Sequence, residues 1–442
     1  MKFTIPSLKI KKNDLYFIVA MSAFMEPALF TQFKIIDAVF LILKVVSAIY
    51  VLYELFCSKI SRFHITIVCY FGSLVLSTAI NGGDVFQAIR TVTFNMLPCL
   101  FLDLMIQRNS TRTVILLRKI CVAYVLINAL LLIIVPDGFG KYIPGYSMTV
   151  DSRLNFLGRD NALIHFFIFA LLVEFLRSRK KEQAYLMTAV MITTMLYVWS
   201  GTGVVVCVLI TAFALLFQGK RIEHFFNIID LTIAYIVIYC AIVVFRLQNL
   251  FSGIIVDVLH KDITFTGRTS LWDMAMWYIQ KKPYIGYGIT AKFLTMKSGI
   301  SYSPHNLVLQ IVLAGGFLSL LCFVIMYIAS VKKISKRKYV YSSLLAVSIF
   351  CYLVASLTES TMNTQYFYLI LVLAYNIDIM VISETPKLKP HIDMMKANLQ
   401  SILEIPLDRI SIKATTNEML GAIGRREGIA AQAVVSVYEG EI

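Results

Sequence analysis

The chain has 442 residues, of which 58% are apolar and only 15% are charged, and its formal net charge is +15. Soluble domains average about 45–50% apolar and about 25% charged residues, so this composition excludes an ordinary soluble protein. Most cations lie in short loops between apolar runs, which indicates membrane topology and argues against a nucleic-acid partner.

Apolar runs of about 20 residues, the length that crosses a bilayer, recur along the chain. They predict an all-α polytopic membrane protein with about twelve transmembrane helices. The first run is long and lacks a small-residue cleavage site, so we expect a retained helix rather than a signal peptide. The candidate spans are residues 14–33, 36–57, 63–80, 86–106, 114–136, 161–177, 183–199, 202–218, 226–246, 304–330, 339–358 and 362–382.

Charged residues occur inside several of these runs. Glu26, followed by Pro27, lies in the first run, Lys44 lies in the second, and Arg90 and Asp103 lie in the fourth. An acid inside a span is a functional candidate by default. Glu26 is also shallow enough to be a hydrogen-bonded residue at the membrane interface.

Every second short loop is basic, which predicts the orientation of the chain. By the positive-inside rule both termini face the cytoplasm, and the long loops 137–160 and 247–303 face outward. We expect residues 1–383 to form the membrane domain. The basic loops lie near residues 9–12, 59–62, 108–119, 177–181, 220–221 and 332–338.

The second outer loop predicts a helix over residues 269–280, because apolar side chains recur there at helical spacing. Trp272 and Trp277 suit an interfacial helix, since aromatic residues collect at headgroup depth. Pro283 and Gly286 then end the helix.

The end of that loop predicts the start of the tenth span. Ser303 has the residue type of an N-cap and Pro304 that of a first helical position, which places His305 and Asn306 in the first turn. The positive end of the helix dipole disfavours imidazolium there, so a neutral His305 can accept a proton from a hydroxyl. The alternative is a polar cap residue bonded to backbone.

Arg268 is the leading cation of the outer loops, because its planar guanidinium suits bidentate phosphate contacts. The alternative is an arginine that extends to lipid headgroups. Arg153 and Arg159 are further candidates, with loop solvation as the alternative. The eight cysteines form no CxxC pair, and we find no cluster of ligands with metal-binding spacing. We therefore expect neither metal nor cofactor.

Residues 384–442 are polar and charged, and no run there is long enough to span a membrane. We expect a small α+β cytoplasmic tail, with a helix over 390–403 and strands over 410–414 and 429–437. About sixty residues are few for an independent core.

An ordered set of motifs in the second outer loop and the tenth span resembles the late region of the O-antigen ligase and polymerase superfamily. The set comprises Gly267-Arg268, Trp272, Pro283-x-x-Gly286-x-Gly288, His305-Asn306 and Gly315-Gly316. Arg153, Gly158 and Asn161 resemble the arginine-bearing outer loop upstream in the same proteins.

This resemblance implies an integral-membrane glycosyltransferase of the large GT-C type in the bacterial cytoplasmic (inner) membrane. It implies a polymerase that joins O-antigen or capsule repeat units carried on undecaprenyl diphosphate, with a flippase and a chain-length regulator as partners. Arg268, with Arg153 or Arg159, would hold the diphosphate, Asn306 would contact substrate, and His305 would assist the acceptor hydroxyl. The alternatives are a ligase of the same fold, a flippase or transporter of lipid-linked oligosaccharides, and a non-catalytic scaffold.

The tail resembles an unrelated enzyme, the C-terminal third of 2-C-methyl-D-erythritol 2,4-cyclodiphosphate synthase. That enzyme binds its metal through an Asp-x-His in its N-terminal part, which has no counterpart here, and Arg426 stands where glycine is usual. We therefore expect no synthase activity, and a fusion remnant, an engineered appendage and a chimera all stay open. The similar motifs are Lys413-Ala414-Thr415-Thr416-Asn417-Glu418, Leu420-Gly421, Gly424-Arg425 and Glu427-Gly428-Ile429-Ala430.

The alternation of basic loops generates a topology test. In a cysteine-free background, a membrane-impermeant thiol reagent added to intact cells should label Asp262→Cys but not Ser335→Cys, since only the first position lies in a predicted outer loop. Mass tagging on gels measures the labelling. Modification of Ser335→Cys in intact cells would overturn the orientation.

Overall fold

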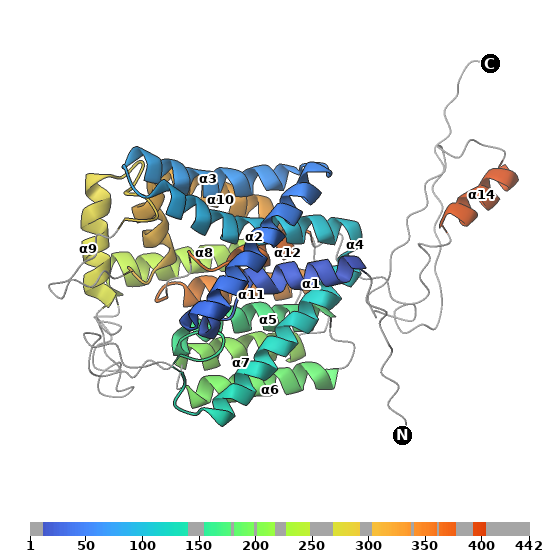
Figure 1. Cartoon of the computed structure of the whole chain (residues 1–442), viewed down its shortest axis with the longest axis horizontal. Helices are drawn as coiled ribbons and strands as arrows, with labels where there is room; N and C mark the ends of the chain where they lie inside the picture. Colours follow the sequence, from blue (N-terminus) through green and yellow to red (C-terminus); the bar gives the residue numbers. More distant parts are fainter. Residues whose placement is uncertain are drawn as a thin grey trace, which may run out of the picture. The chain divides into compact units, whose positions relative to one another are not determined.

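The computed structural model describes residues 12–139, 154–177, 181–198, 201–216, 227–247, 268–291, 303–336, 340–359, 362–376 and 392–403. Within these ranges the regular elements are all helices, and one isolated bridge joins Leu154 to Arg159. The helices of Figure 1 are α1 Lys12–Phe24, η1 Ala28–Gln32, α2 Lys34–Phe56, α3 Arg62–Ile80, α4 Val85–Ile134, η2 Asp160–Ala162, α5 Leu163–Arg177, α6 Lys181–Tyr197, α7 Gly201–Leu216, α8 Ile228–Tyr239, η3 Cys240–Val244, α9 Arg268–Lys281, α10 Leu307–Lys336, α11 Val340–Ala355, α12 Tyr366–Tyr375 and α14 Ile392–Leu403.

The chain divides into two compact units, Met1–Asp378 and Ile379–Ile442. Within the second unit, α14 confirms the helix predicted over 390–403. The strands predicted over 410–414 and 429–437 lie outside the described residues.

In the described part of the first unit, four helices are long and apolar enough to cross a membrane: Lys34–Phe56, Arg62–Ile80, Val85–Ile134 and Leu307–Lys332. Six more apolar helices are shorter. Along α2, Ile35, Ile42, Ile49 and Phe56 are all exposed, which in water would be an aggregating surface but in a bilayer faces lipid. The fold is therefore that of a helical membrane protein.

Two buried helices form the centre of the bundle. The side chains of α12 from Phe367 to Ala374 are all buried, and so are those of α5 from Leu163 to Glu174. Helices that are apolar on every side belong in the interior. The other helices pack around them, with α3 lying most extensively against α10.

The first predicted span was wrong in its length, because α1 ends at Phe24. Pro27 disfavours helical backbone in the residue before it, so the chain leaves the helix at Met25 and continues as η1. Glu26, at this break, pairs with Lys44 of α2 at 2.5 Å. The two charges that interrupt the first and second spans thus neutralise each other.

The fourth and fifth predicted spans form one element, α4, which breaks at Asn109 (φ −158°). Its 50 residues are long enough for two crossings. Three arginines around the break hold acids on other helices, so the break joins α1, α2 and α5 to α4. The pairs are Arg108–Glu54, Arg112–Asp14 and Arg118–Glu174.

Helix α10 is broken at Gly316 (φ 65°, ψ −168°), and the segment that follows α9 repairs the break. The amides of Tyr287 and Gly288 donate to the carbonyls of Leu313 and Ala314, both at 2.8 Å. On the other side of the break, the amides of Phe317 and Leu318 donate to Pro283 and Tyr284 at 2.8 and 3.1 Å. The inserted segment replaces the helix bonds that the break removes, as membrane depth requires.

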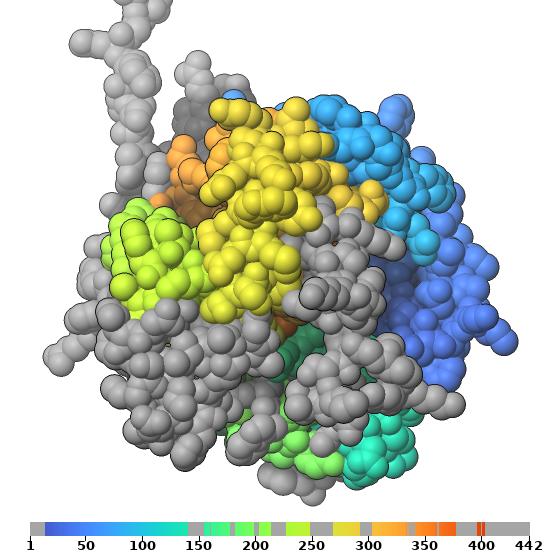
Figure 2. Space-filling view, turned by 90° about the vertical axis from the view of Figure 1, so that its left-hand side faces the viewer, coloured from blue at the N-terminus to red at the C-terminus, as the bar shows by residue number. Residues whose placement is uncertain are grey.

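Helix α3 holds the inserted segment from the other side. The Ser77 hydroxyl contacts the carbonyls of Ile285 (2.6 Å) and Ala314 (2.7 Å), and the Asn81 amide donates to Gly286 at 3.1 Å. This contact fixes α9 across one end of the bundle, in contact with α10 (Figures 1 and 2). We call this end of the molecule the α9 end.

The inserted segment has no room for a side chain at Gly286, whose φ is +70°. A Cβ there would lie 2.6 Å from the Leu313 carbonyl and 2.7 Å from the Gly316 amide. We expect Gly286→Ala to lower the free energy of unfolding by about 2–4 kcal/mol through left-handed strain and overpacking. Gly72→Ala in α3, where nothing lies within 4 Å of the new methyl, is the control and should be neutral or stabilising. Thermal unfolding in detergent measures both, and equal melting would contradict the assignment.

Candidate functional site

Helix α9 begins with Arg268, and this arginine contacts Glu359 in the turn that follows α11. Arg268 Nη2 lies 2.6 Å from Glu359 Oε1, with the two side chains 19% and 16% exposed. The predicted helix over 269–280 is confirmed. Its first residue forms a shielded ion pair, and the acid that completes the pair was not found from the sequence.

His305 lies beside the same carboxylate. Its Nδ1 is 3.9 Å from Glu359 Oε2, an ion-pair separation longer than a hydrogen bond. The side chain is 35% exposed, so the imidazole keeps an accessible edge. One carboxylate therefore lies between an arginine and a histidine that are 37 residues apart in the chain.

The start of α10 differs from the prediction. The helix begins at Leu307 and its cap is Asn306, whose Oδ1 accepts from the amide of Leu309 at 3.0 Å. His305 precedes the cap with φ 46°, a left-handed conformation that is uncommon for a residue other than glycine. The prediction of Ser303 as N-cap was wrong, because the asparagine side chain satisfies the first-turn amide instead. The argument that the dipole keeps His305 neutral loses its geometric basis.

Asn306 is fully buried, and its amide is used within the protein. Besides capping α10, it donates from Nδ2 to the carbonyl of Leu357 at 3.1 Å. The amide of Leu307 donates to Ser356 at 3.0 Å. In this structure Asn306 holds the start of α10 against the turn that carries Glu359, so its amide is not free for the substrate contact predicted for it.

Trp272 does not lie at the membrane interface as predicted. It is fully buried, and its indole donates to the carbonyl of Pro304, next to His305, at 2.9 Å. Trp277, one and a half turns further along α9, is 51% exposed and fits the predicted interfacial role. The two tryptophans of α9 therefore lie in different environments: Trp272 packs into the protein interior, and Trp277 is exposed.

A second arginine contacts the first turns of α9. Arg246 Nη2 lies 2.7 Å from Asp273 Oδ1 and 3.2 Å from the carbonyl of Thr269, and the guanidinium stacks 4.9 Å from the ring of Trp272. Among the described residues its Nη1 is buried without a hydrogen-bond partner, and its φ is 54°. The sequence gives little to mark this arginine, because the loop that follows it over residues 247–303 carries six further lysines and arginines.

The loop predicted to face outward over residues 137–160 is only partly described. Arg159 is exposed and forms the bridge with Leu154 just before α5, whereas Arg153 lies outside the described residues. Asp160 begins η2, and α5 starts at Leu163. The pairing of either arginine with Arg268 stays a prediction.

The charges around Glu359 keep it ionised. Burial, the largest single effect, raises its pKa, but His305, Arg268 and the buried His165 of α5 together lower the pKa below its ordinary value. The carboxylate is therefore an anion at neutral pH, able to orient His305 and to hold Arg268. Within the described residues no group of three or more His, Cys, Asp or Glu gathers as a metal site.

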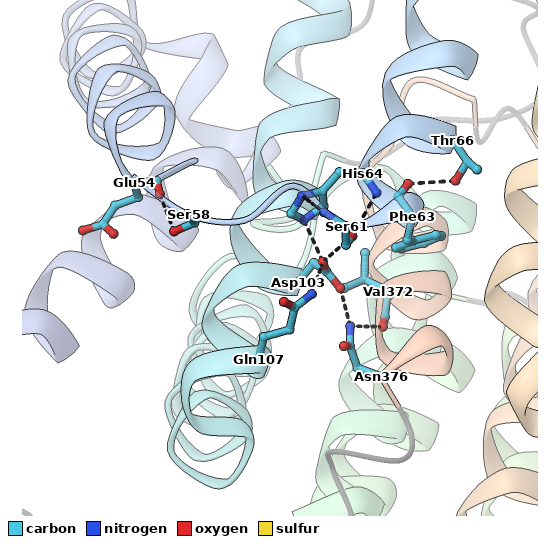
Figure 3. A network of polar contacts seen from close by, with 10 residues as sticks. All are labelled: Glu54, Ser58, Ser61, Phe63, His64, Thr66, Asp103, Gln107, Val372 and Asn376. Atoms are coloured by element: carbon cyan, nitrogen blue, oxygen red, sulfur yellow. Dashed lines mark hydrogen bonds and ion pairs between the residues drawn. The ribbon is translucent and has the colours of Figure 1, made fainter. Parts of the chain in front are cut away.

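A second buried ionic cluster surrounds Asp103 of α4 (Figure 3). His64 Nε2 lies 2.6 Å and Gln107 Nε2 2.7 Å from its Oδ2, and Asn376 Nδ2 lies 2.5 Å from its Oδ1. Ser61 and His64 also form the capping box of α3. Asp103 and His64 are almost completely buried, so the acid and the histidine of this cluster join α3 and α4 in the interior, and Asn376 ties them to the end of α12.

Comparisons with known proteins agree with both resemblances. Residues 161–324 match the family described as O-Antigen ligase, and residues 371–438 match the YgbB family. The first match includes Arg246, Arg268, His305 and Asn306; Glu359 lies beyond it. The second begins inside α12.

Three curated relatives align with this chain over a length close to that of the YgbB match. The bifunctional enzyme IspD/IspF of Bartonella quintana (strain Toulouse) is 62% identical over 68 residues, which are 15% of this chain and 17% of that protein. The 2-C-methyl-D-erythritol 2,4-cyclodiphosphate synthases of Burkholderia mallei (strain SAVP1) and Burkholderia pseudomallei (strain 668) are each 55% identical over 62 residues, or 14% of this chain and 38% of each enzyme. The chain thus spans well under half the length of these relatives.

The burial of Asp103 among its hydrogen-bond partners predicts a large effect on stability when it is replaced. Asp103→Ala should lower the free energy of unfolding by about 3–5 kcal/mol, because His64, Gln107 and Asn376 lose a buried acceptor. Arg108→Ala is the control: its partner is Glu54, its side chain is 43% exposed, and the expected loss is under about 1 kcal/mol. Thermal unfolding compares them. A stable but inactive Asp103→Ala would show that this cluster is functional.

Proposed function

We propose that this protein is an integral-membrane glycosyltransferase that transfers a glycan from undecaprenyl diphosphate to a sugar hydroxyl at the outer face of the bacterial cytoplasmic membrane. The observation that carries the proposal is the convergence of Arg268 and His305 on Glu359 at the α9 end, within and beside the O-antigen ligase match. The arginine, the partly exposed histidine and the carboxylate together suit displacement of an anionic leaving group by a hydroxyl.

The proposed reaction uses three groups. The acceptor hydroxyl attacks the anomeric carbon, the bond from that carbon to the diphosphate oxygen breaks, and the hydroxyl proton passes to the accessible edge of His305. Glu359 stabilises the resulting imidazolium. Arg268 offsets the charge on the departing diphosphate, the role that a metal has in many phosphate chemistries.

Within this class we propose a polymerase of O-antigen or capsule repeat units, assisted by a flippase and a chain-length regulator. A ligase of the same fold is the second candidate, favoured by the description of the matching family. The broken helix α10 is a feature that transporters share. Here the break is filled by backbone from Pro283 to Gly288, so it lends no support to a flippase.

For the tail we propose no synthase activity and no part in glycosyl transfer. Residues 384–442 belong to the second compact unit, and their relatives align over a small share of their own length. Truncation after Ser383, followed by assay of polymer at matched membrane levels, tests this separation. Loss of polymer would give the tail a role.

The ion pair with Glu359 generates a prediction for Arg268. Arg268→Lys keeps the charge but loses the planar fork, so transfer from a purified lipid-linked donor should fall by about 10²–10³-fold, the effect of about 2.7–4 kcal/mol on the transition state. Arg108→Lys, at an exposed ion pair on another part of the bundle, is the matched control and should stay near wild type. Normal transfer by a well-expressed Arg268→Lys would assign Arg268 to lipid headgroups.

The positive φ of His305 decides which substitution tests its role best. Asparagine tolerates a positive φ better than most residues, so His305→Asn keeps the local conformation while removing the base. We expect a loss of turnover of about 10²–10⁴-fold, with donor binding little changed, measured by steady-state transfer and by lipid binding. His305→Ala should lose at least as much. Recovery of activity in His305→Asn would make His305 a positioning group.

A further inference from the structure

Glu359 is shared between two basic partners that contact different oxygens. Oε1 holds Arg268 at 2.6 Å, and Oε2 lies 3.9 Å from Nδ1 of His305. The first contact is a charge-assisted hydrogen bond and the second falls short of one. The carboxylate is thus committed to the arginine.

His305 lacks a hydrogen bond on the side that faces Glu359 within the described residues. Nδ1 of His305 is buried and has no hydrogen-bond partner among the described residues. A buried polar atom without a partner is unfavourable, so a small movement of the Glu359 carboxylate toward Nδ1 would be stabilising once its hold on Arg268 weakened. A diphosphate is the ligand that would weaken that hold, because it offers the guanidinium a stronger anion.

We propose that Glu359 is a positioning residue that couples binding of the lipid diphosphate to the basicity of His305. The inference rests on the proposed function. When the diphosphate engages Arg268, the carboxylate is released from the arginine and accepts a hydrogen bond from Nδ1–H of His305. The opposite ring nitrogen then becomes a better proton acceptor, so the base is activated when the leaving group is in place.

Other charged groups surround this pair. His165 of α5 acts on Glu359 electrostatically, and Arg246 lies against Trp272 with its charge offset by Asp273. The hydroxyl of Tyr239 in α8 lies 3.5 Å from Oδ1 of Asn306. Arg268 is the one of these groups bonded directly to Glu359, so removal of its charge should act on His305 chiefly through the carboxylate.

The sign of the effect follows from the charges. An anion beside an imidazole favours its protonated form and raises its pKa, whereas a cation lowers it. Arg268 offsets the field of Glu359 at His305, and a bound diphosphate would remove this offset. Donor binding should therefore raise the pKa of His305, through Glu359 and, in smaller part, through the charge of the diphosphate itself.

The test measures the pKa of His305 in the full chain in lipid nanodiscs. The rate of carbethoxylation at His305, followed by peptide mass spectrometry across pH, is compared with and without undecaprenyl diphosphate in wild type and Glu359→Gln. We expect a rise of about one unit on lipid addition in wild type and less than half of it in Glu359→Gln. Glu359→Asp, whose shorter side chain reaches less far, should give an intermediate rise and serves if the glutamine variant does not fold.

Binding of the lipid is measured separately by native mass spectrometry, so the outcomes are distinguishable. Equal pKa rises in wild type and Glu359→Gln, with lipid bound to both, would overturn the coupling and leave the proposed transferase intact. Absence of undecaprenyl diphosphate binding to wild type would overturn the proposed function and this inference with it. A double-mutant cycle without lipid checks the direction of the effect of Arg268 on His305. Arg268→Gln should raise the pKa of His305 more when Glu359 is present than in the Glu359→Gln background.

Discussion

The arrangement of this protein depends on the insertion of one backbone segment into a broken transmembrane helix. Polar backbone groups at membrane depth need protein partners, and a helix that opens at Gly316 exposes several of them. Residues from Pro283 to Gly288 supply these partners by pairing with both sides of the break. A Cβ on Gly316 would lie 2.2 Å from the Tyr284 carbonyl group, so the inserted segment and α10 approach each other too closely for a side chain at this position.

This insertion determines where the chemistry-bearing residues lie. It ties the C-terminal end of α9 to α10 and α3, so α9 lies across the end of the bundle (Figures 1 and 2). Buried Trp272 then fixes the helix against Pro304, and Asn306 fixes the start of α10 against the turn after α11. Arg268, His305 and Glu359 come from three separate segments, each held by backbone contacts a few residues away.

Several ionisable groups inside the bundle are paired, which lowers the cost of placing their charges within a membrane. Glu26 neutralises Lys44, and Asp103 has four polar neighbours in Figure 3. His64 beside Asp103 is almost fully buried, whereas His305 beside Glu359 is 35% exposed and has two arginines near it. Both groups contain a histidine beside a shielded acid, and the exposure of the imidazole is what distinguishes them.

The sequence by itself determined the membrane class, the positions of most helices, the helix of α9 and both family resemblances, because hydropathy, helical spacing and motif order are local properties. It also selected Arg268 and His305. It did not find Glu359 or Arg246, and it placed Trp272 at the interface and His305 inside a helix. Only the tertiary structure decided these points, because the partner of an ionisable side chain lies tens of residues away and Asn306, rather than Ser303, satisfies the amide at the start of α10. Local rules specify which residues can bind a diphosphate or a proton, and long-range packing specifies which of them share one carboxylate.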